Sequence, residues 1–165
     1  GTLSVSLWIY LCWIGEIYGQ AVINLFFLVM NIYGWDNWSR KDNSDLNKVQ
    51  IKFSSIKENT LYIIVAALLT LLIYWGLSNI EILNFDWKFV LIESFITALN
   101  FIAMWLMAWK RVENWVLCII GDIFCIPLFV FKEYYLSVAQ FSIFIIIAFM
   151  GYFEWKKKAL KNQEK

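Results

Sequence analysis

Six apolar segments, separated by short polar stretches, run along the chain. They cover residues 3–18, 21–35, 60–77, 89–108, 115–131 and 134–153. At a rise of 1.5 Å per residue, a helix of about 20 residues crosses the hydrocarbon core of a bilayer. The third, fourth and sixth segments reach this length as they stand, and the other three need flanking residues. The pattern predicts an all-α membrane protein with at least six spanning helices.

Composition agrees with that fold class. Of the 165 residues, 61% are hydrophobic and only 16% are charged, whereas about a quarter of the residues in a soluble domain are charged. The net charge of +1 gives the chain no overall positive charge, so nucleic-acid binding has little support. The one long polar stretch, residues 36–58, contains scattered apolar residues, and we expect it to be a connector along the membrane surface.

Basic residues indicate the orientation. All but two of the 14 lysines and arginines fall between the second and third segments, between the fourth and fifth, or after the sixth. The two exceptions, Lys88 and Lys132, lie in the alternate loops. Because basic residues are enriched in cytoplasmic loops, we expect a lipid-embedded chain with a cytoplasmic C-terminus.

The chain also contains an internal repeat with an offset of 117 residues. Gly34-Trp35-Asp36-Asn37-Trp38 at the end of the second segment corresponds to Gly151-Tyr152-Phe153-Glu154-Trp155 at the end of the sixth. The offset also pairs Glu16 with Glu133, Tyr18 with Tyr135 and Phe27 with Phe144. Both copies end on the same side, so the repeats are parallel and the third segment restores the orientation between them.

The repeat predicts a 3+1+3 helix arrangement of two triple-helix repeats. The fourth segment lacks a counterpart before Gly1, so we expect that an N-terminal helix precedes this sequence in the intact protein. The predicted division is residues 1–41 for a partial first repeat, 42–88 for the connector and linker helix, 89–158 for the second repeat and 159–165 for a cytoplasmic tail.

Two motifs carry a family resemblance. Asn31-Ile32-Tyr33-Gly34-Trp35, followed by Trp38-Ser39-Arg40, and Val112-Glu113-Asn114-Trp115 resemble signatures of the bacterial PnuC nicotinamide riboside transporters. The resemblance implies a SWEET-like fold, a homotrimer, and a place in the bacterial inner (cytoplasmic) membrane. Similar proteins carry thiamine or riboflavin, so it implies vitamin uptake more firmly than the particular vitamin.

Polar residues inside the apolar segments are candidate site residues, because such groups are costly in a membrane. Asp122 is the clearest candidate, although a structural hydrogen bond would also explain it. Glu93 either contacts substrate or reaches the interface. The amides form a second set, for which helix-to-helix hydrogen bonding is the alternative role: Asn24, Asn31, Asn100 and Gln140. Asn24 and Asn31 are seven residues apart and share a helix face, and we expect them to face a central cavity with Gln140.

Aromatic residues complete the predicted site. Trp105 lies deeper than the tryptophans of the interfacial belts, and Trp115 lies on the helix face that also carries Asp122. Tyr33 and Asn114 belong to the two motifs. Nicotinamide riboside joins a pyridinium cation to a ribose, so it calls for an aromatic face, a carboxylate or amide, and hydrogen-bonding groups. Trp115, Asp122, Asn31 and Gln140 supply these types.

We expect alternating access without a coupled ion, ATP or any cofactor, with trapping of the vitamin by a separate kinase. An intramembrane enzyme is disfavoured, because the chain has no histidine and its cysteines, Cys12, Cys118 and Cys125, lie in apolar segments. A zinc site would need thiolates and carboxylates alone. A structural subunit and a SWEET-type sugar porter remain the alternatives.

Overall fold

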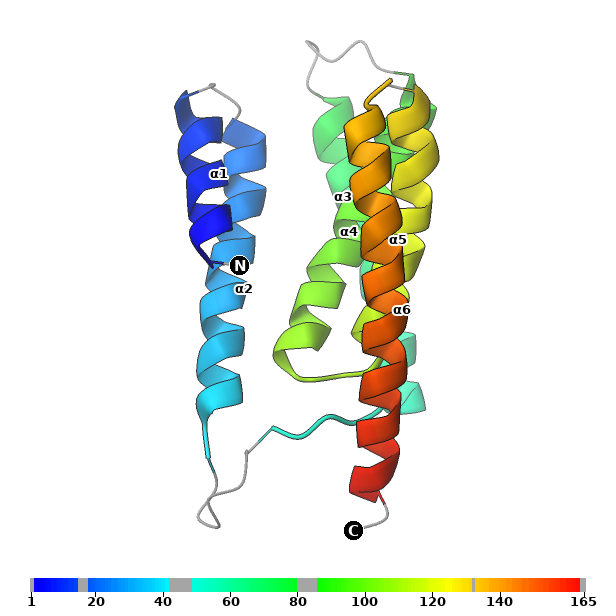
Figure 1. Cartoon of the computed structure of the whole chain (residues 1–165). Helices are drawn as coiled ribbons and strands as arrows, with labels where there is room; N and C mark the ends of the chain where they lie inside the picture. The colour runs from blue at the N-terminus through cyan, green and yellow to red at the C-terminus, as the bar shows by residue number, and fades with distance from the viewer. Residues whose placement is uncertain (1, 15–17, 42–48, 80–85, 132, 164–165) are drawn as a thin grey trace.

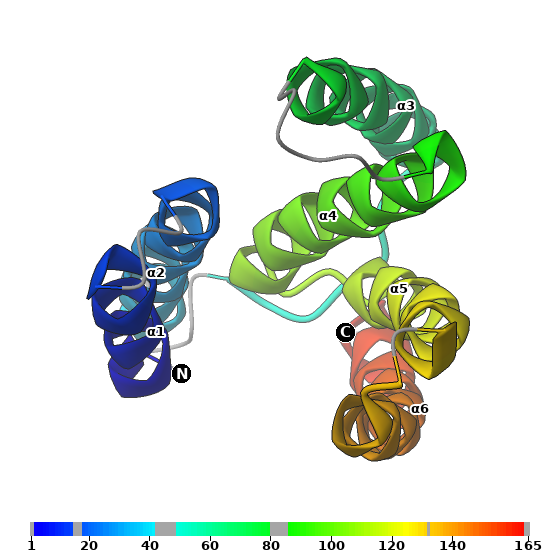
Figure 2. The same cartoon turned by 90° about the horizontal axis from the view of Figure 1, so that it is seen from above.

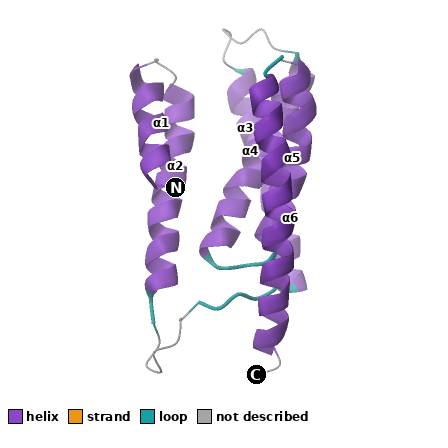
Figure 3. Ribbon diagram, viewed as in Figure 1, coloured by secondary structure: helices purple, strands orange, loops and turns teal. Residues whose placement is uncertain are grey.

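The computed structural model describes residues 2–14, 18–41, 49–79, 86–131 and 133–163. Within these ranges the chain forms six helices joined by loops, as Figure 3 shows. They are α1 (Thr2–Ile14), α2 (Tyr18–Ser39), α3 (Ile56–Ser78), α4 (Trp87–Ala108), α5 (Glu113–Phe131) and α6 (Tyr135–Gln163). The prediction of an all-helical protein is therefore confirmed.

Helix α4 is the centre of the arrangement. Seen from above, α3 and α5 pack against it, α6 packs against α5, and the α1–α2 pair stands on the other side of α4 (Figure 2). The C-terminal end of α4 leans toward α2, while its N-terminal end lies beside α3 and α5 (Figures 1 and 2). The first two helices therefore meet the other four mainly through one end of α4.

Four of these helices, α3 to α6, are long and apolar enough to cross a membrane. Many of their large apolar side chains are exposed, among them Leu61, Ile63, Leu68 and Leu72 of α3, which suits a surface covered by lipid. Helix α1 has 13 described residues. Four spans are thus confirmed by length and composition, and the predicted total of six stays a prediction.

Helix boundaries follow the predicted repeat. The offset of 117 residues that relates the two sequence copies also relates the end of α1 at Ile14 to the end of α5 at Phe131. It relates the start of α2 at Tyr18 to the start of α6 at Tyr135. The chain reverses direction at corresponding points in both copies, which supports the correspondence of α1–α2 with α5–α6.

The polar stretch predicted as a connector contains the end of α2, an extended strap and the start of α3. Residues 36–39 continue α2, residues 49–55 form an extended strap, and α3 begins at Ile56. The strap pairs with the α4–α5 turn through an isolated bridge between Lys52 and Arg111. Val49 of the strap is buried, and Ile51 and Phe53 are half-buried. Leu46, another apolar residue of the predicted connector, lies outside the described residues, and the placement of the connector along the membrane surface stays a prediction.

Two local signals fix the ends of α3 and α4. Ser55 accepts a hydrogen bond from Glu58 N–H, and the Glu58 carboxylate accepts one from Ser55 N–H at 2.7 Å, which is a capping box. After α4, Lys110 adopts φ 51°. Lys110 N–H then donates to Met107 O at 3.0 Å and Arg111 N–H to Leu106 O at 2.9 Å, the pairing of a Schellman motif.

The loops with most of the basic residues lie at one end of the molecule. The C-terminus of α2, the strap, the α4–α5 turn and the C-terminus of α6 share the lower end in Figure 1. We call this the basic end. Lys88, at the start of α4, lies at the opposite end, as the charge pattern predicts.

Candidate substrate site

Aromatic rings line the contact between α2 and α4. The rings of Phe26 and Phe101 have centroids 4.5 Å apart. Closer to the basic end, the ring of Tyr33 stacks on the ring of Trp105, with centroids 6.1 Å apart and an interplanar angle of 9°. A groove of about 420 Å³ lies beside these rings and is lined by Phe26, Phe101 and Trp105. Residues of α3 form a third wall of this groove. The contact therefore offers ring faces within the apolar layer.

Toward the basic end, α2 docks onto the last residues of α4. A Cβ built on Gly34 would lie 3.6 Å from Ala108 Cα, so the backbones approach closely. Asn37 Nδ2 donates to Ala108 O at 2.9 Å, and Trp38 Nε1 donates to the same oxygen at 3.1 Å. A helix leaves its last carbonyls without partners in its own backbone. Helix α2 therefore caps the end of α4.

Trp38 makes three further contacts at this end, the first of which is a second hydrogen bond from Nε1 to Met107 O at 3.2 Å. Lys110 Nζ lies 5.2 Å from the Trp38 ring centroid, within cation–π range, and burial lowers the pKa of the Lys110 ammonium. The rings of Trp38 and Trp155 lie 6.0 Å apart. These two tryptophans occupy equivalent positions in the repeat, so the copies meet through matching residues.

Trp115 packs within the second copy. Its ring meets Trp155 edge-on at 5.5 Å. A Cβ built on Gly151 would come within 2.6 to 2.7 Å of three atoms of the Trp115 ring, so only glycine leaves room for the ring there. Trp115 Nε1 is buried and has no hydrogen-bond partner among the described residues. A buried donor of this kind calls for a water or a ligand atom.

Two polar residues lie close to the contact between the middle of α5 and α4. Asp122 is half-buried and lies one residue from Gly121. Asn100 Oδ1 reaches from α4 to 4.0 Å from the position of a Cβ on Gly121. Asn100 therefore lies beside the turn of α5 that contains Asp122.

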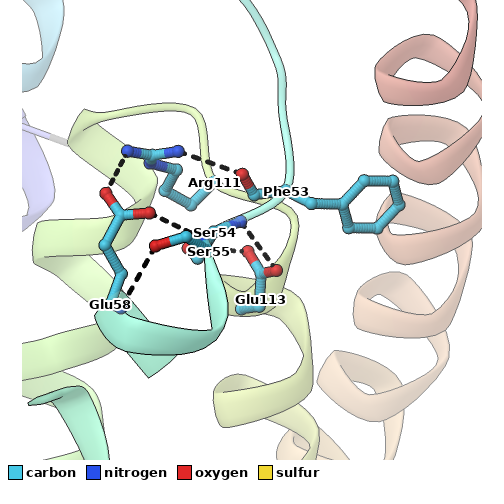
Figure 4. A network of polar contacts seen from close by, with 6 residues as sticks. All are labelled: Phe53, Ser54, Ser55, Glu58, Arg111 and Glu113. Atoms are coloured by element: carbon cyan, nitrogen blue, oxygen red, sulfur yellow. Dashed lines mark hydrogen bonds and ion pairs between the residues drawn. The ribbon is translucent and has the colours of Figure 1, made fainter. Parts of the chain in front are cut away.

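A polar network ties the strap to the second copy, as Figure 4 shows. Arg111 bonds with Glu58 Oε1 at 2.6 Å and donates to Phe53 O at 3.0 Å. Glu113 accepts from Ser54 N–H at 2.9 Å and from the Ser54 hydroxyl at 3.0 Å. Near the end of α6, Asn162 Nδ2 donates to Ile51 O at 3.1 Å. The start of α3 is thereby fixed to the α4–α5 turn.

A larger groove of about 700 Å³ lies between α3, α4 and α5. Apolar residues such as Ile63, Phe95 and Leu117 form most of its wall, with Asn59, Tyr62 and Glu113 at the basic end. Its lining suits acyl chains better than a polar nucleoside.

The ten predicted site residues fall into different surroundings. Tyr33 and Trp105 meet in the aromatic contact, and Asn100 lies near the Asp122 turn of α5. Asn24 is buried, Asn31 and Glu93 are half-buried, and Gln140 is exposed on α6. Asn114 is fully buried and donates to Met107 Sδ at 3.4 Å. Only Trp105 of the ten lines either groove, so substrate contact stays a prediction for all of them.

Several residues that matter in this structure were missed by the sequence reasoning. Asn37 caps α4, Arg111 and Glu113 hold the strap, and Gly151 makes room for Trp115. The capping box was visible as Ser-x-x-Glu at residues 55–58. The partners of Asn37 and Arg111, by contrast, are more than 50 residues away, and nothing in the sequence pairs them.

Comparisons with known proteins agree with this architecture. The family model for the nicotinamide mononucleotide transporter matches residues 1–157. The nicotinamide riboside transporters PnuC of Escherichia coli (strain K12) and Shigella flexneri are each 24% identical over 179 residues, covering 96% of this chain and 75% of the relative. The crystal structure of the vitamin B3 transporter PnuC has a TM-score of 0.73 at 18% identity, covering 98% of this chain and 71% of that one.

The sequence match extends over nearly the whole chain, and the structural match shows the same fold. These matches confirm the expected family resemblance. The matching proteins are described as transporters, which agrees with the prediction that this chain is not an enzyme. The chain belongs to the nicotinamide mononucleotide transporter family, the family of the PnuC vitamin transporters.

Proposed function

We propose that this protein takes up nicotinamide riboside across the cytoplasmic membrane. The observation that carries the proposal is the family match over residues 1–157 together with relatives described as nicotinamide riboside transporters. The ligand chemistry fits, because a pyridinium cation is attracted by ring faces and by a carboxylate. The Tyr33–Trp105 stack, the Trp115 indole and Asp122 provide these groups.

Charge favours the riboside over the mononucleotide. A phosphate dianion calls for arginine or lysine. In the described residues, the basic side chains lie at helix ends or in the strap, the turn and the C-terminal turns of α6, whereas Glu93 and Asp122 lie within α4 and α5. A neutral ribose with a cationic ring suits such an interior better than a phosphate does.

The proposed architecture is the 3+1+3 arrangement, with α3 linking the half that contains α1 and α2 to the half formed by α4, α5 and α6. The basic end faces the cytoplasm, in accordance with the charge rule, and the protein is a homotrimer in the inner membrane, as the resemblance implies. Substrate binds between the halves, in contact with those of the ten predicted residues that the packing leaves accessible, which excludes the fully buried Asn114. Rocking of the halves opens this site to each side in turn.

Substrate identity is tested by counterflow in liposomes containing the purified protein. Labelled nicotinamide riboside competes with unlabelled nicotinamide riboside, nicotinamide mononucleotide, thiamine, riboflavin and glucose. We expect unlabelled nicotinamide riboside to compete best. Exchange of glucose or riboflavin without exchange of nicotinamide riboside would contradict the proposal. Accumulation of nicotinamide riboside driven by a pH gradient would show that transport is coupled to protons and is not facilitated diffusion.

Asp122 is tested by its charge. Asp122→Asn keeps the shape and removes the negative charge, and we expect the dissociation constant for nicotinamide riboside to rise about tenfold, which corresponds to about 1.4 kcal/mol. Asp36→Asn is the matched control, because Asp36 is exposed and pairs with Arg40 one turn away. Quenching of tryptophan fluorescence measures both. An unchanged constant in Asp122→Asn would remove Asp122 from the site. Absence of quenching by every vitamin tested would favour a structural subunit.

A further inference from the structure

We propose that the tryptophan pair Trp38–Trp155, together with the cap that α2 places on α4, is the gate that closes the basic end of the transport path. This inference rests on the proposed function, because a gate requires a path. Its first support is position. Trp38 and Trp155 are equivalent in the repeat and their rings lie 6.0 Å apart. Residues related by the repeat can meet only where the two halves adjoin.

The contacts between the halves are concentrated at this end. In the described part of the chain, the α2–α4 ring contacts begin at Phe26 and Phe101, and they continue to the hydrogen bonds of Asn37 and Trp38 with the end of α4. Beyond this region α4 leans away from α2, and its N-terminal end lies beside α3 and α5 (Figures 1 and 2). The halves are therefore joined at the basic end and diverge toward the other.

The bonds that join the halves are of a kind that can open. Ala108 O is the acceptor for both Asn37 and Trp38, while the Schellman motif satisfies the carbonyls of Leu106 and Met107 within α4 and its turn. Water at the membrane surface can replace these side-chain donors when α2 withdraws. The α4 end is thus capped in the closed state and hydrated in the open state, with no backbone group left unpaired.

The other side of the gate is held rigid. Arg111 and Glu113 fix the strap and the start of α3 to the α4–α5 turn, and α5 packs on α6 with Trp115 against Trp155. Trp155 is therefore anchored in the second half, whereas Trp38 sits on the last helical turn of α2. In this arrangement α2 is the part that moves, and Trp38 is the side chain that separates from Trp155 when the gate opens.

The first test locks the gate. In a parent without native cysteines (Cys12→Ala, Cys118→Ala, Cys125→Ala), the pair Trp38→Cys and Trp155→Cys is joined by a short bis-methanethiosulfonate. We expect counterflow to fall at least tenfold and to return after reduction. The matched control joins Phe95→Cys to Phe124→Cys, because these rings lie 5.4 Å apart within one half, and its counterflow should persist. A fully cross-linked 38–155 pair that keeps more than half of its counterflow would overturn the gate.

The second test needs no substrate. Asn31 lies on the same face of α2 as Trp38, about 10 Å deeper at 1.5 Å per residue. Asn31→Cys in the cysteine-free parent is treated with a membrane-impermeant thiol reagent added on the side of the basic end. Labelling of a separate Lys157→Cys variant identifies that side. We expect Trp155→Ala to raise the rate of labelling at least fivefold and Phe124→Ala to leave it unchanged.

Equal labelling rates in the Trp155 and Phe124 variants would refute the gate whatever the substrate is. A gate that labels as expected in a protein that fails to exchange nicotinamide riboside would refute the proposed substrate alone. The two proposals therefore fail in different measurements.

Discussion

Among the glycines that the structure describes, Gly151 is the one where an added methyl group meets the closest neighbours. In Gly151→Ala the new Cβ would lie 2.6 Å from Trp115 Cζ2 and 2.7 Å from two neighbouring ring atoms. These distances are shorter than real Cβ contacts, and the Trp115 ring also packs edge-on against Trp155, which restricts its room to move. Forcing a group into a packed site costs about 1–3 kcal/mol.

Helix propensity acts in the opposite direction and must be separated from the clash. Replacing glycine by alanine inside a helix stabilises it by up to about 1 kcal/mol. Gly121→Ala is the matched control, because Gly121 also faces a neighbouring helix, but its nearest atom, Asn100 Oδ1, lies 4.0 Å from the new Cβ. We expect Gly121→Ala to be neutral or stabilising, and Gly151→Ala to be less stable than it by about 1–3 kcal/mol.

The assay is unfolding in mixed micelles of a mild detergent and dodecyl sulfate, followed by circular dichroism. A double-mutant cycle identifies the source of the effect. Trp115→Phe removes the ring atoms that the new Cβ meets, so Gly151→Ala should cost less in that background by at least about 1 kcal/mol. Equal stability of Gly151→Ala and Gly121→Ala, or an equal cost in both backgrounds, would refute the packing argument.

Three further changes test the capping and the strap. Ser55→Ala removes the cap of α3 and should destabilise the protein by about 1 kcal/mol in the same unfolding assay; no change would show that the capping box is dispensable. Arg111→Gln leaves Glu58 without its partner and should cost about 1–3 kcal/mol, with partial recovery when Glu58→Gln is added; an additive loss would mean that the two side chains act independently. Asn37→Ala removes one of two donors to Ala108 O and should cost about 1 kcal/mol, measured as a lower unfolding midpoint, and an unchanged midpoint would show that Trp38 alone satisfies that oxygen.

Helical class, the limits of α4 to within two residues and the repeat were all predictable from the sequence. The reason is that bilayer solvation acts on each segment separately: a run of apolar residues such as 89–108 must be helical in lipid whatever its neighbours are. The same local logic covers the charge pattern, because Lys88 and Lys110 experience the membrane surface at their own positions. The start of α3 at Ile56 is also encoded locally, because Ser55 and Glu58 form a capping box. The apolar segment begins only at residue 60, so hydropathy alone places the start of this helix too late.

The tertiary structure decided which polar residues meet. Asn114 precedes the fifth apolar segment and Asp122 lies within it, and the sequence made both candidate site residues, yet Asn114 is sealed against Met107 and Asp122 is half-exposed. Trp38 and Trp155 are recognisable as repeat mates from the sequence, but only the packing of two parallel halves brings their rings together. Apolar runs and surface charge are responses to the solvent, which every residue meets directly, whereas a contact between distant helices depends on the tilt and rotation of both. The sequence of either helix alone does not contain that information.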